Sequence, residues 1–137
     1  MAPLVAPFRW LGRAVAGEQL RLPDELLATF PELADARWRR GGLFVRVGGW
    51  CIGTSTVAGI TLWRTVWLAP GVPLHPALLL HELRHVHQFG ADLLFPLSYI
   101  WESFRRGYRG NRYEADAIAY ARHRLLGGRH PPPQKEP

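Results

Sequence analysis

Cysteine, lysine and long apolar runs are scarce in this sequence. Among its 137 residues Cys51 is the single cysteine, and Lys135 is the only lysine. One cysteine excludes an intrachain disulfide and a zinc site built on cysteine ligands. It agrees with a reducing compartment, where disulfides are rare.

The charge is positive and almost entirely due to arginine. The formal net charge is +6, with 17 basic and 11 acidic residues. Such a balance is compatible with an anionic partner such as nucleic acid. The arginines are scattered, however, and their denser groups are short. These groups are Arg37, Arg39 and Arg40, and Arg105, Arg106, Arg109 and Arg112. We therefore do not expect a nucleic-acid partner, and a DNA-guided protease is kept as an alternative.

No segment has the length and apolarity of a membrane span, which takes about 18 apolar residues. The best stretch, Phe89 to Trp101, contains Asp92 and Pro96. Near the N-terminus, Arg9 and Arg13 break any apolar signal-peptide core. These features predict no membrane span and a cytoplasmic location, with secretion by a specialised system as the alternative.

The length and composition predict one globular domain. An apolar fraction of 47% in a chain of 137 residues is ordinary for a domain with one core. We assign residues 1–130 to this domain. Three consecutive prolines mark residues 131–137, which we expect to form a disordered tail.

Turn residues divide the first two thirds of the chain. The run Leu22-Pro23-Asp24 predicts a helix start and Pro31 its end. Leu43 to Val47 alternates apolar residues with Arg46 and predicts a strand. β-branched and aromatic residues dominate Gly59 to Leu68, which predicts one strand, or two joined at Trp63-Arg64.

Helical patterns dominate the remainder. We expect helices over Ala77 to Phe89, ended by Gly90, and over Leu97 to Phe104. A last helix would run from Arg112 to Leu126, with Asn111 as its cap. A helix, then strands, then helices predicts an α+β domain in which a small sheet packs against helices.

The run His81-Glu82-Leu83-Arg84-His85 matches the HExxH pattern. At about 100° per residue, His85 falls about 40° and Glu82 about 100° from His81 on a helix. Two imidazoles one turn apart can bind one zinc, and the intervening glutamate can reach a zinc-bound water. An apolar back completes the pattern: Leu79, Leu83 and Val86. The alternative is a solvated face with chance histidines. The predicted helix, its apolar back and an acidic helix downstream favour a Zn²⁺ site.

Two polar neighbours extend the motif. Gln88 falls beside His81 on the helix, where it either hydrogen-bonds to a ligand or borders the site. His87 lies far from the ligand face and is expected to pack or face solvent.

A catalytic zinc needs a third protein ligand and an open position for water. The available side chains are Asp92, Glu102, Glu114, Asp116 and His123. Glu114 is favoured, since Ala117 and Ala121 on its face permit close packing against the motif helix. Asp116 lies about 200° round the same helix, so the two cannot both bind. Asp116 is then a charge favoured at a helix start, or part of a local hydrogen-bond cluster.

Three segments together resemble the minimal gluzincin peptidases, in particular the DUF4157 type of metallopeptidase-like domain associated with contractile injection systems and toxins. They are Gly59 to Leu68, Leu80 to Gln88 and Tyr113 to Ala117. The resemblance covers roughly residues 20–126. It implies a zincin-like fold, with His81, His85 and Glu114 as zinc ligands and Glu82 as catalytic base. It also implies that the strand before the motif helix lines the site.

The expected activity is zinc-dependent hydrolysis of a peptide or protein substrate. Glu82 would take a proton from the attacking water. A tyrosine often stabilises the oxyanion, and Tyr99, Tyr108 and Tyr113 are the candidates. The main alternative is a non-catalytic zincin-like binding or scaffold module, although such a module needs no base at Glu82.

Overall fold

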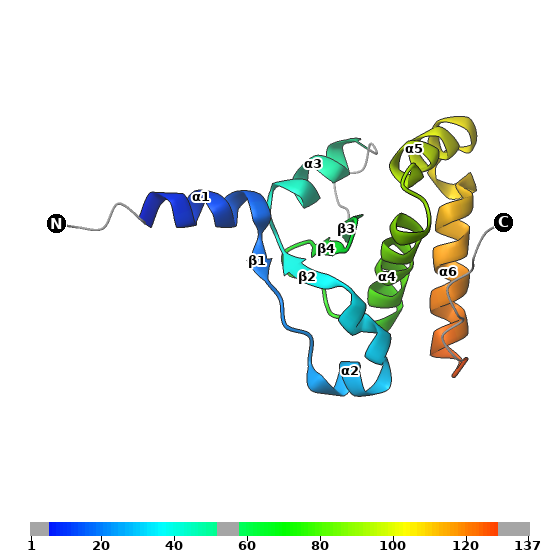
Figure 1. Cartoon of the computed structure of the whole chain (residues 1–137), viewed down its shortest axis with the longest axis horizontal. Helices are drawn as coiled ribbons and strands as arrows, with labels where there is room; N and C mark the ends of the chain where they lie inside the picture. The colour runs from blue at the N-terminus through cyan, green and yellow to red at the C-terminus, as the bar shows by residue number, and fades with distance from the viewer. Residues whose placement is uncertain (1–5, 52–57, 129–137) are drawn as a thin grey trace.

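The computed structural model describes residues 6–51 and 58–128 (Figure 1). Within these ranges the chain forms a four-stranded sheet and six α-helices. This mixed architecture agrees with the predicted α+β class. The predicted tail, residues 131–137, lies outside the described part of the chain.

The sheet is small and mixed. Its strand order is β1-β2-β4-β3, in which β2 and β4 are parallel and the other neighbouring pairs antiparallel. The strands are β1 (Glu18–Gln19), β2 (Arg37–Arg40), β3 (Gly59–Leu62) and β4 (Thr65–Leu68). β3 and β4 form a hairpin turning at Trp63 and Arg64, where Trp63 has a φ of 51°. The prediction of two strands joined there is confirmed.

Strand β2 was not predicted, because three of its four residues are arginines. Trp38 alone is buried, and its indole nitrogen donates to the carbonyl oxygen of Leu33 at 2.8 Å. Two of the arginines donate to carbonyl oxygens of neighbouring segments. Arg39 reaches Ala16 at 2.5 Å, and Arg40 reaches Val72 at 2.8 Å. These bonds hold a polar strand inside the sheet.

The predicted strand at Leu43–Val47 is wrong, since these residues belong to helix α3 (Leu43–Cys51). Gly41 and Gly42 both have positive φ, 70° and 95°, and turn the chain out of the sheet before them. A five-residue alternation is too short to distinguish a strand from a helix. Here the place beside β4 is taken by β2.

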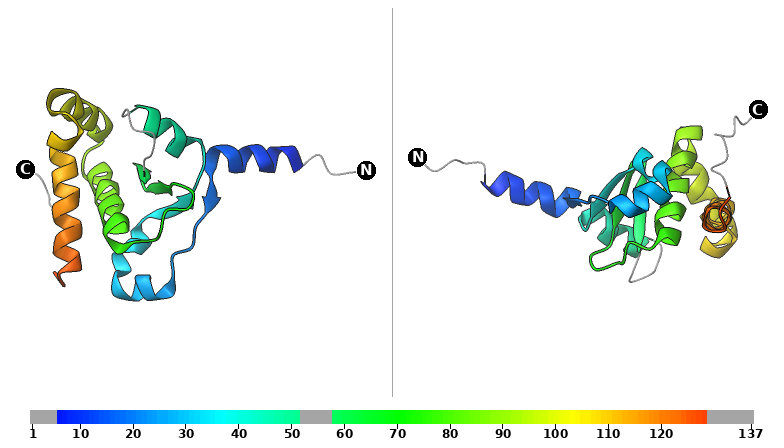
Figure 2. Two further views of the ribbon diagram at one scale, coloured as in Figure 1. Left: turned by 180° about the vertical axis from the view of Figure 1, so that it is seen from behind. Right: turned by 90° about the horizontal axis from the view of Figure 1, so that it is seen from below.

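Helices α1 (Ala6–Ala16) and α2 (Asp24–Thr29) precede strand β2 in the chain. Helix α1 projects from the rest of the described chain (Figures 1 and 2). Helix α2 begins where predicted, after Pro23, and a 3₁₀ helix follows at Pro31–Asp35. Phe30 is buried, whereas Leu26 and Leu27 are partly buried against the core.

Helix α4 (Pro76–Ala91) carries the HExxH run and lies between the sheet and α6 (Arg112–Leu125) (Figures 1 and 2). It is slightly longer than predicted and includes Gly90. Its apolar back is buried as predicted, and it packs with side chains of the sheet and α6. The core cluster comprises Leu22, Phe30, Leu33, Ala36, Trp38, Val66, Leu68, Leu79, Leu80, Leu83, Val86, Tyr120 and Ala121.

Asn111 joins the last two helices. Its side-chain oxygen caps α6 by accepting from the backbone N–H of Tyr113 at 2.9 Å, as predicted. Its amide nitrogen donates to Tyr99 O at 3.2 Å and Ser103 Oγ at 2.8 Å, both on α5 (Phe95–Arg106). One fully buried side chain therefore fixes the start of α6 against α5.

Candidate metal centre

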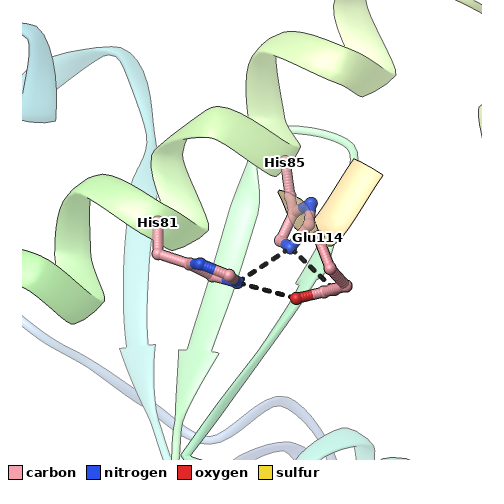
Figure 3. A group of neighbouring side chains, drawn as sticks. All are labelled: His81, His85 and Glu114. Atoms are coloured by element: carbon pink, nitrogen blue, oxygen red, sulfur yellow. Dashed lines mark hydrogen bonds and ion pairs between the residues drawn. The ribbon is translucent and has the colours of Figure 1, made fainter. Parts of the chain in front are cut away.

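Three side chains predicted as ligands meet between α4 and α6 (Figure 3). His81 and His85 extend from successive turns of α4, and Glu114 from the first turn of α6. His81 Nε2 lies 3.1 Å from Glu114 Oε2, and His85 Nε2 lies 3.2 Å from Glu114 Oε1. The two Nε2 atoms are 3.2 Å apart.

Each histidine nitrogen lies near a different oxygen of Glu114, and with one donor atom from each residue all three donors lie within 4.8 Å of one another, close enough to share one ion. Donor atoms bound to zinc at about 2.0–2.1 Å with tetrahedral angles lie roughly 3.3 Å from one another. Two imidazole nitrogens and a carboxylate oxygen are also a donor set that zinc accepts, and three protein ligands leave a position open. The three residues could therefore hold one metal ion, and their chemistry suits zinc.

Burial and mutual contact shift the ionisation of the cluster. His85 and Glu114 are buried, and His81 is partly exposed. Burial opposes ionisation of Glu114, but hydrogen bonds from His81, His85 and Tyr99 hold its pKa well below the usual range. Burial likewise lowers the pKa of His85, but its contact with Glu114 and the charge of Glu82 raise the pKa overall. The carboxylate thus stays ionised, as a metal ligand must.

Gln88 orients His85. Of the two alternatives for Gln88, a hydrogen bond to a ligand candidate or a place at the border of the site, the structure has the hydrogen bond. Its amide nitrogen donates to the Tyr113 carbonyl oxygen at 3.1 Å and to Asp116 Oδ2 at 2.8 Å. Its oxygen therefore faces His85 Nδ1, at 2.8 Å. Because an amide oxygen only accepts, Nδ1 carries a proton, so the neutral form of this imidazole would offer the Nε2 lone pair to a metal ion.

Asp116 does not enter the cluster. It accepts from Arg84 of α4 at 2.6 and 3.2 Å, as well as from Gln88. Burial raises its pKa, but these two partners outweigh burial and lower it. Asp116 thus ties α6 to α4 and supports the amide that orients His85.

Glu82 lies between α4 and the edge strand β3. Its carboxylate accepts from the Thr61 hydroxyl at 2.7 Å and is buried. Gly59, on the same face of β3, leaves room for it, since a Cβ there would lie 3.0 Å from Glu82 Oε1. The charge of Glu82 also raises the pKa of His85.

The three predicted tyrosines differ in position. The Tyr99 hydroxyl donates to Glu114 Oε1 at 2.6 Å. Burial and the nearby Glu114 charge raise the pKa of Tyr108 to about 12, and burial and Glu114 raise that of Tyr99 further. Both hydroxyls therefore keep their protons near neutral pH. The Tyr113 hydroxyl instead accepts from Arg112 at 2.9 Å, so this residue contributes to the site through its carbonyl.

The other acidic and histidine candidates lie elsewhere. Asp92 ends α4 and accepts from the backbone N–H of Leu94 at 2.8 Å. Glu102 is buried on α5, 3.6 Å from Arg106, and His123 is exposed near the end of α6. His87 points away from the cluster, toward Asp35 and Tyr120. None of these side chains belongs to the described group of possible ligands.

Sequence reasoning missed Gly59, Thr61 and Arg84. Residues two apart face one side of a strand, so Gly59 and Thr61 could have been assigned together to the face that meets α4. Arg84 has no such signal, because an arginine within HExxH is unconstrained by the pattern.

No protein-family model, curated protein or solved structure matches this chain.

Proposed function

We propose that this protein is a zinc-dependent peptidase with a zincin-like arrangement of sheet and motif helix. The observation that carries the proposal is the convergence of His81, His85 and Glu114, whose possible donor atoms lie within 4.8 Å of one another. The three side chains come from two helices and from positions 33 residues apart along the chain, His81 to Glu114. Helical spacing alone does not bring Glu114 to this point.

The chemistry follows from the residues around the cluster. Bound zinc would acidify a water molecule and polarise a peptide carbonyl. Glu82 would accept the proton of that water and return it to the leaving amine. Thr61 holds the Glu82 carboxylate by its hydroxyl, so the base has one defined position.

The sheet suggests how a peptide would be presented. β3 is one of the two edge strands of the described sheet, and its Gly59 and Thr61 lie next to Glu82 on α4. An extended peptide can add to an exposed edge through backbone hydrogen bonds. A peptide lying along β3 would then pass close to Glu82, which favours peptides over compact small molecules as substrates.

Glu82→Gln tests the assignment. The amide is nearly isosteric and can keep the Thr61 contact, but it cannot accept the proton. Hydrolysis of a fluorogenic peptide library should fall by roughly 10²-fold or more, while zinc content and the unfolding midpoint stay unchanged. Glu25→Gln on exposed α2 is the matched control and should retain full activity. A Glu82→Gln protein that cleaves at the wild-type rate would exclude Glu82 as the base.

A further inference from the structure

The outer face of α5 is a continuous apolar stripe. Leu97, Ile100, Trp101 and Phe104 recur at the spacing of one helix face, and Leu93 and Leu94 precede them. All six side chains are between 58% and 93% exposed. The Trp101 and Phe104 rings stack on each other, with centroids 6.4 Å apart. Single exposed apolar residues are common, but a contiguous patch of this kind marks an interaction site.

The opposite face of the same helix packs against the rest of the protein. Phe95 and Glu102 are buried there, and Tyr99 donates to Glu114 from that side. The stripe therefore cannot turn inward without breaking the metal centre. Helix α5 lies at one end of the molecule, beyond the ends of α4 and α6 (Figure 1).

Positive charge accompanies the stripe. Exposed arginines occupy the end of α5 and the segment after it: Arg105, Arg106, Arg109 and Arg112. Between residues 93 and 113 the only acidic residue is Glu102, which is buried 3.6 Å from Arg106 and 4.0 Å from Arg112. Arg105 and Arg109 have no ionic partner among the described residues. Arg106 and Arg112 therefore lie toward Glu102 and the opposite face, whereas Arg105 and Arg109 leave positive charge near the end of the stripe.

We propose that this α5 patch, residues 93–112, docks on the surface of an anionic lipid membrane. Leucine, tryptophan and phenylalanine beside arginine are the residues that bind the boundary between acyl chains and anionic headgroups. With 12 residues, α5 is about 18 Å long, too short for a hydrocarbon core of about 30 Å. No helix in the described residues is long and apolar enough to cross a membrane. The helix would lie in the plane of the interface.

The composition of the stripe favours lipid over nucleic acid. Single-stranded nucleic acid is bound by aromatic rings on which bases stack, with arginines along the backbone. Four of the six stripe residues are leucine or isoleucine, which offer no stacking face. Embedding them in acyl chains removes their apolar surface from water. Docking would also leave the metal centre intact, because it uses the other side of α5.

Vesicle co-sedimentation tests the proposal with the whole chain. Vesicles of equal parts phosphatidylcholine and phosphatidylglycerol should bind the wild-type protein, and pure phosphatidylcholine should bind it at least several-fold more weakly. Trp101→Ser with Phe104→Ser should weaken binding by roughly tenfold or more. The matched control is Ile118→Ser with Leu126→Ser, two similarly exposed apolar residues on and after α6. It should bind as the wild type does.

A second pair isolates the charge. Arg105→Gln with Arg109→Gln should weaken binding roughly tenfold at low salt and little at high salt. Arg46→Gln with Arg122→Gln, exposed arginines elsewhere, should have no such effect. Unchanged far-ultraviolet circular dichroism would verify that each variant folds.

Three outcomes would overturn the proposal: no binding to the anionic vesicles, equal loss in the stripe and control pairs, or tighter binding to a single-stranded oligonucleotide that the stripe variant abolishes. A wild-type dimer that the stripe variant converts to a monomer, with no vesicle binding in either, would instead assign the stripe to a second copy of the chain.

Discussion

The hydroxyl of Tyr99 on α5 donates a 2.6 Å hydrogen bond to Oε1 of Glu114 on α6. It directs the carboxylate of the proposed third ligand and links α5 to the candidate metal centre. We expect Tyr99→Phe to weaken zinc affinity by roughly tenfold, the lower end of losses seen when a partner of a metal ligand is removed. Competition against a chromophoric chelator measures the affinity.

Tyr113→Phe is the control for this experiment. Its hydroxyl bonds to Arg112, while the part that supports Gln88 is the backbone carbonyl, which the substitution keeps. Its zinc affinity should match the wild type. Equal affinities in Tyr99→Phe and the wild type would show that the Tyr99 bond does not tune the site.

Glu114→Ala and Asp116→Ala distinguish a ligand from a residue that supports one. Loss of Glu114 leaves only the two histidines, too few for a stable zinc site. Losing a hydrogen-bond partner of a metal ligand typically lowers metal affinity 10–100-fold. We expect Asp116→Ala to lower zinc affinity by about this factor and Glu114→Ala to lower it far more. Asp116 acts through Gln88 and Arg84, so its loss disturbs His85 indirectly. Isothermal titration with zinc compares the two variants.

The reverse order would contradict the assignment. If Asp116→Ala stripped the metal while Glu114→Ala retained it, the face of α6 toward α4 would be rotated from the one described. The Arg84–Asp116 pair would then need another explanation.

Gly59→Ala tests whether the position of Glu82 matters for catalysis. A Cβ at Gly59 would lie 3.0 Å from Glu82 Oε1 and 3.2 Å from Leu68 Cδ2, so the carboxylate must move. A displaced catalytic group lowers the rate, here by roughly tenfold or more. Peptide hydrolysis should fall, whereas zinc content should stay unchanged.

Gly90→Ala provides the matched control. Nothing lies within 4 Å of a Cβ at Gly90, which sits within α4. Alanine in a helix is more stable than glycine by roughly 0.5–1 kcal/mol, so this variant should be slightly stabilised and fully active. Equal activity of Gly59→Ala and Gly90→Ala would show that the chain does not need Glu82 in this place.

The α4 helix and its site were the most predictable part of the chain. The helical period of α4 places leucines on one face and the two histidines on another. The leucine face is buried in the core, which leaves the histidines on the side of the candidate site. Glu114 was also reachable, because Ala117 and Ala121 mark the side of α6 that packs closely, and both are buried. The predicted cap at Asn111 is local and follows from residue type alone.

Long-range bonds of polar residues explain what the sequence could not show. The arginines of β2 read as solvent-exposed, yet Arg39 and Arg40 bond to carbonyls 23 and 32 residues away. Similarly, nothing local separates Tyr99 from Tyr113. Which hydroxyl meets Glu114 depends on how α5 packs against α6, and that packing depends partly on the bonds of Asn111 to Tyr99 and Ser103.

Metal content tests the central claim most directly. The protein purified without chelator, or loaded with zinc and desalted, should contain close to one zinc per chain by elemental analysis, since the described ligands form one site. His81→Ala and His85→Ala should each contain almost none, and His123→Ala, an exposed histidine outside the cluster, should retain the wild-type amount. A wild-type protein that holds no transition metal under either condition would contradict the account.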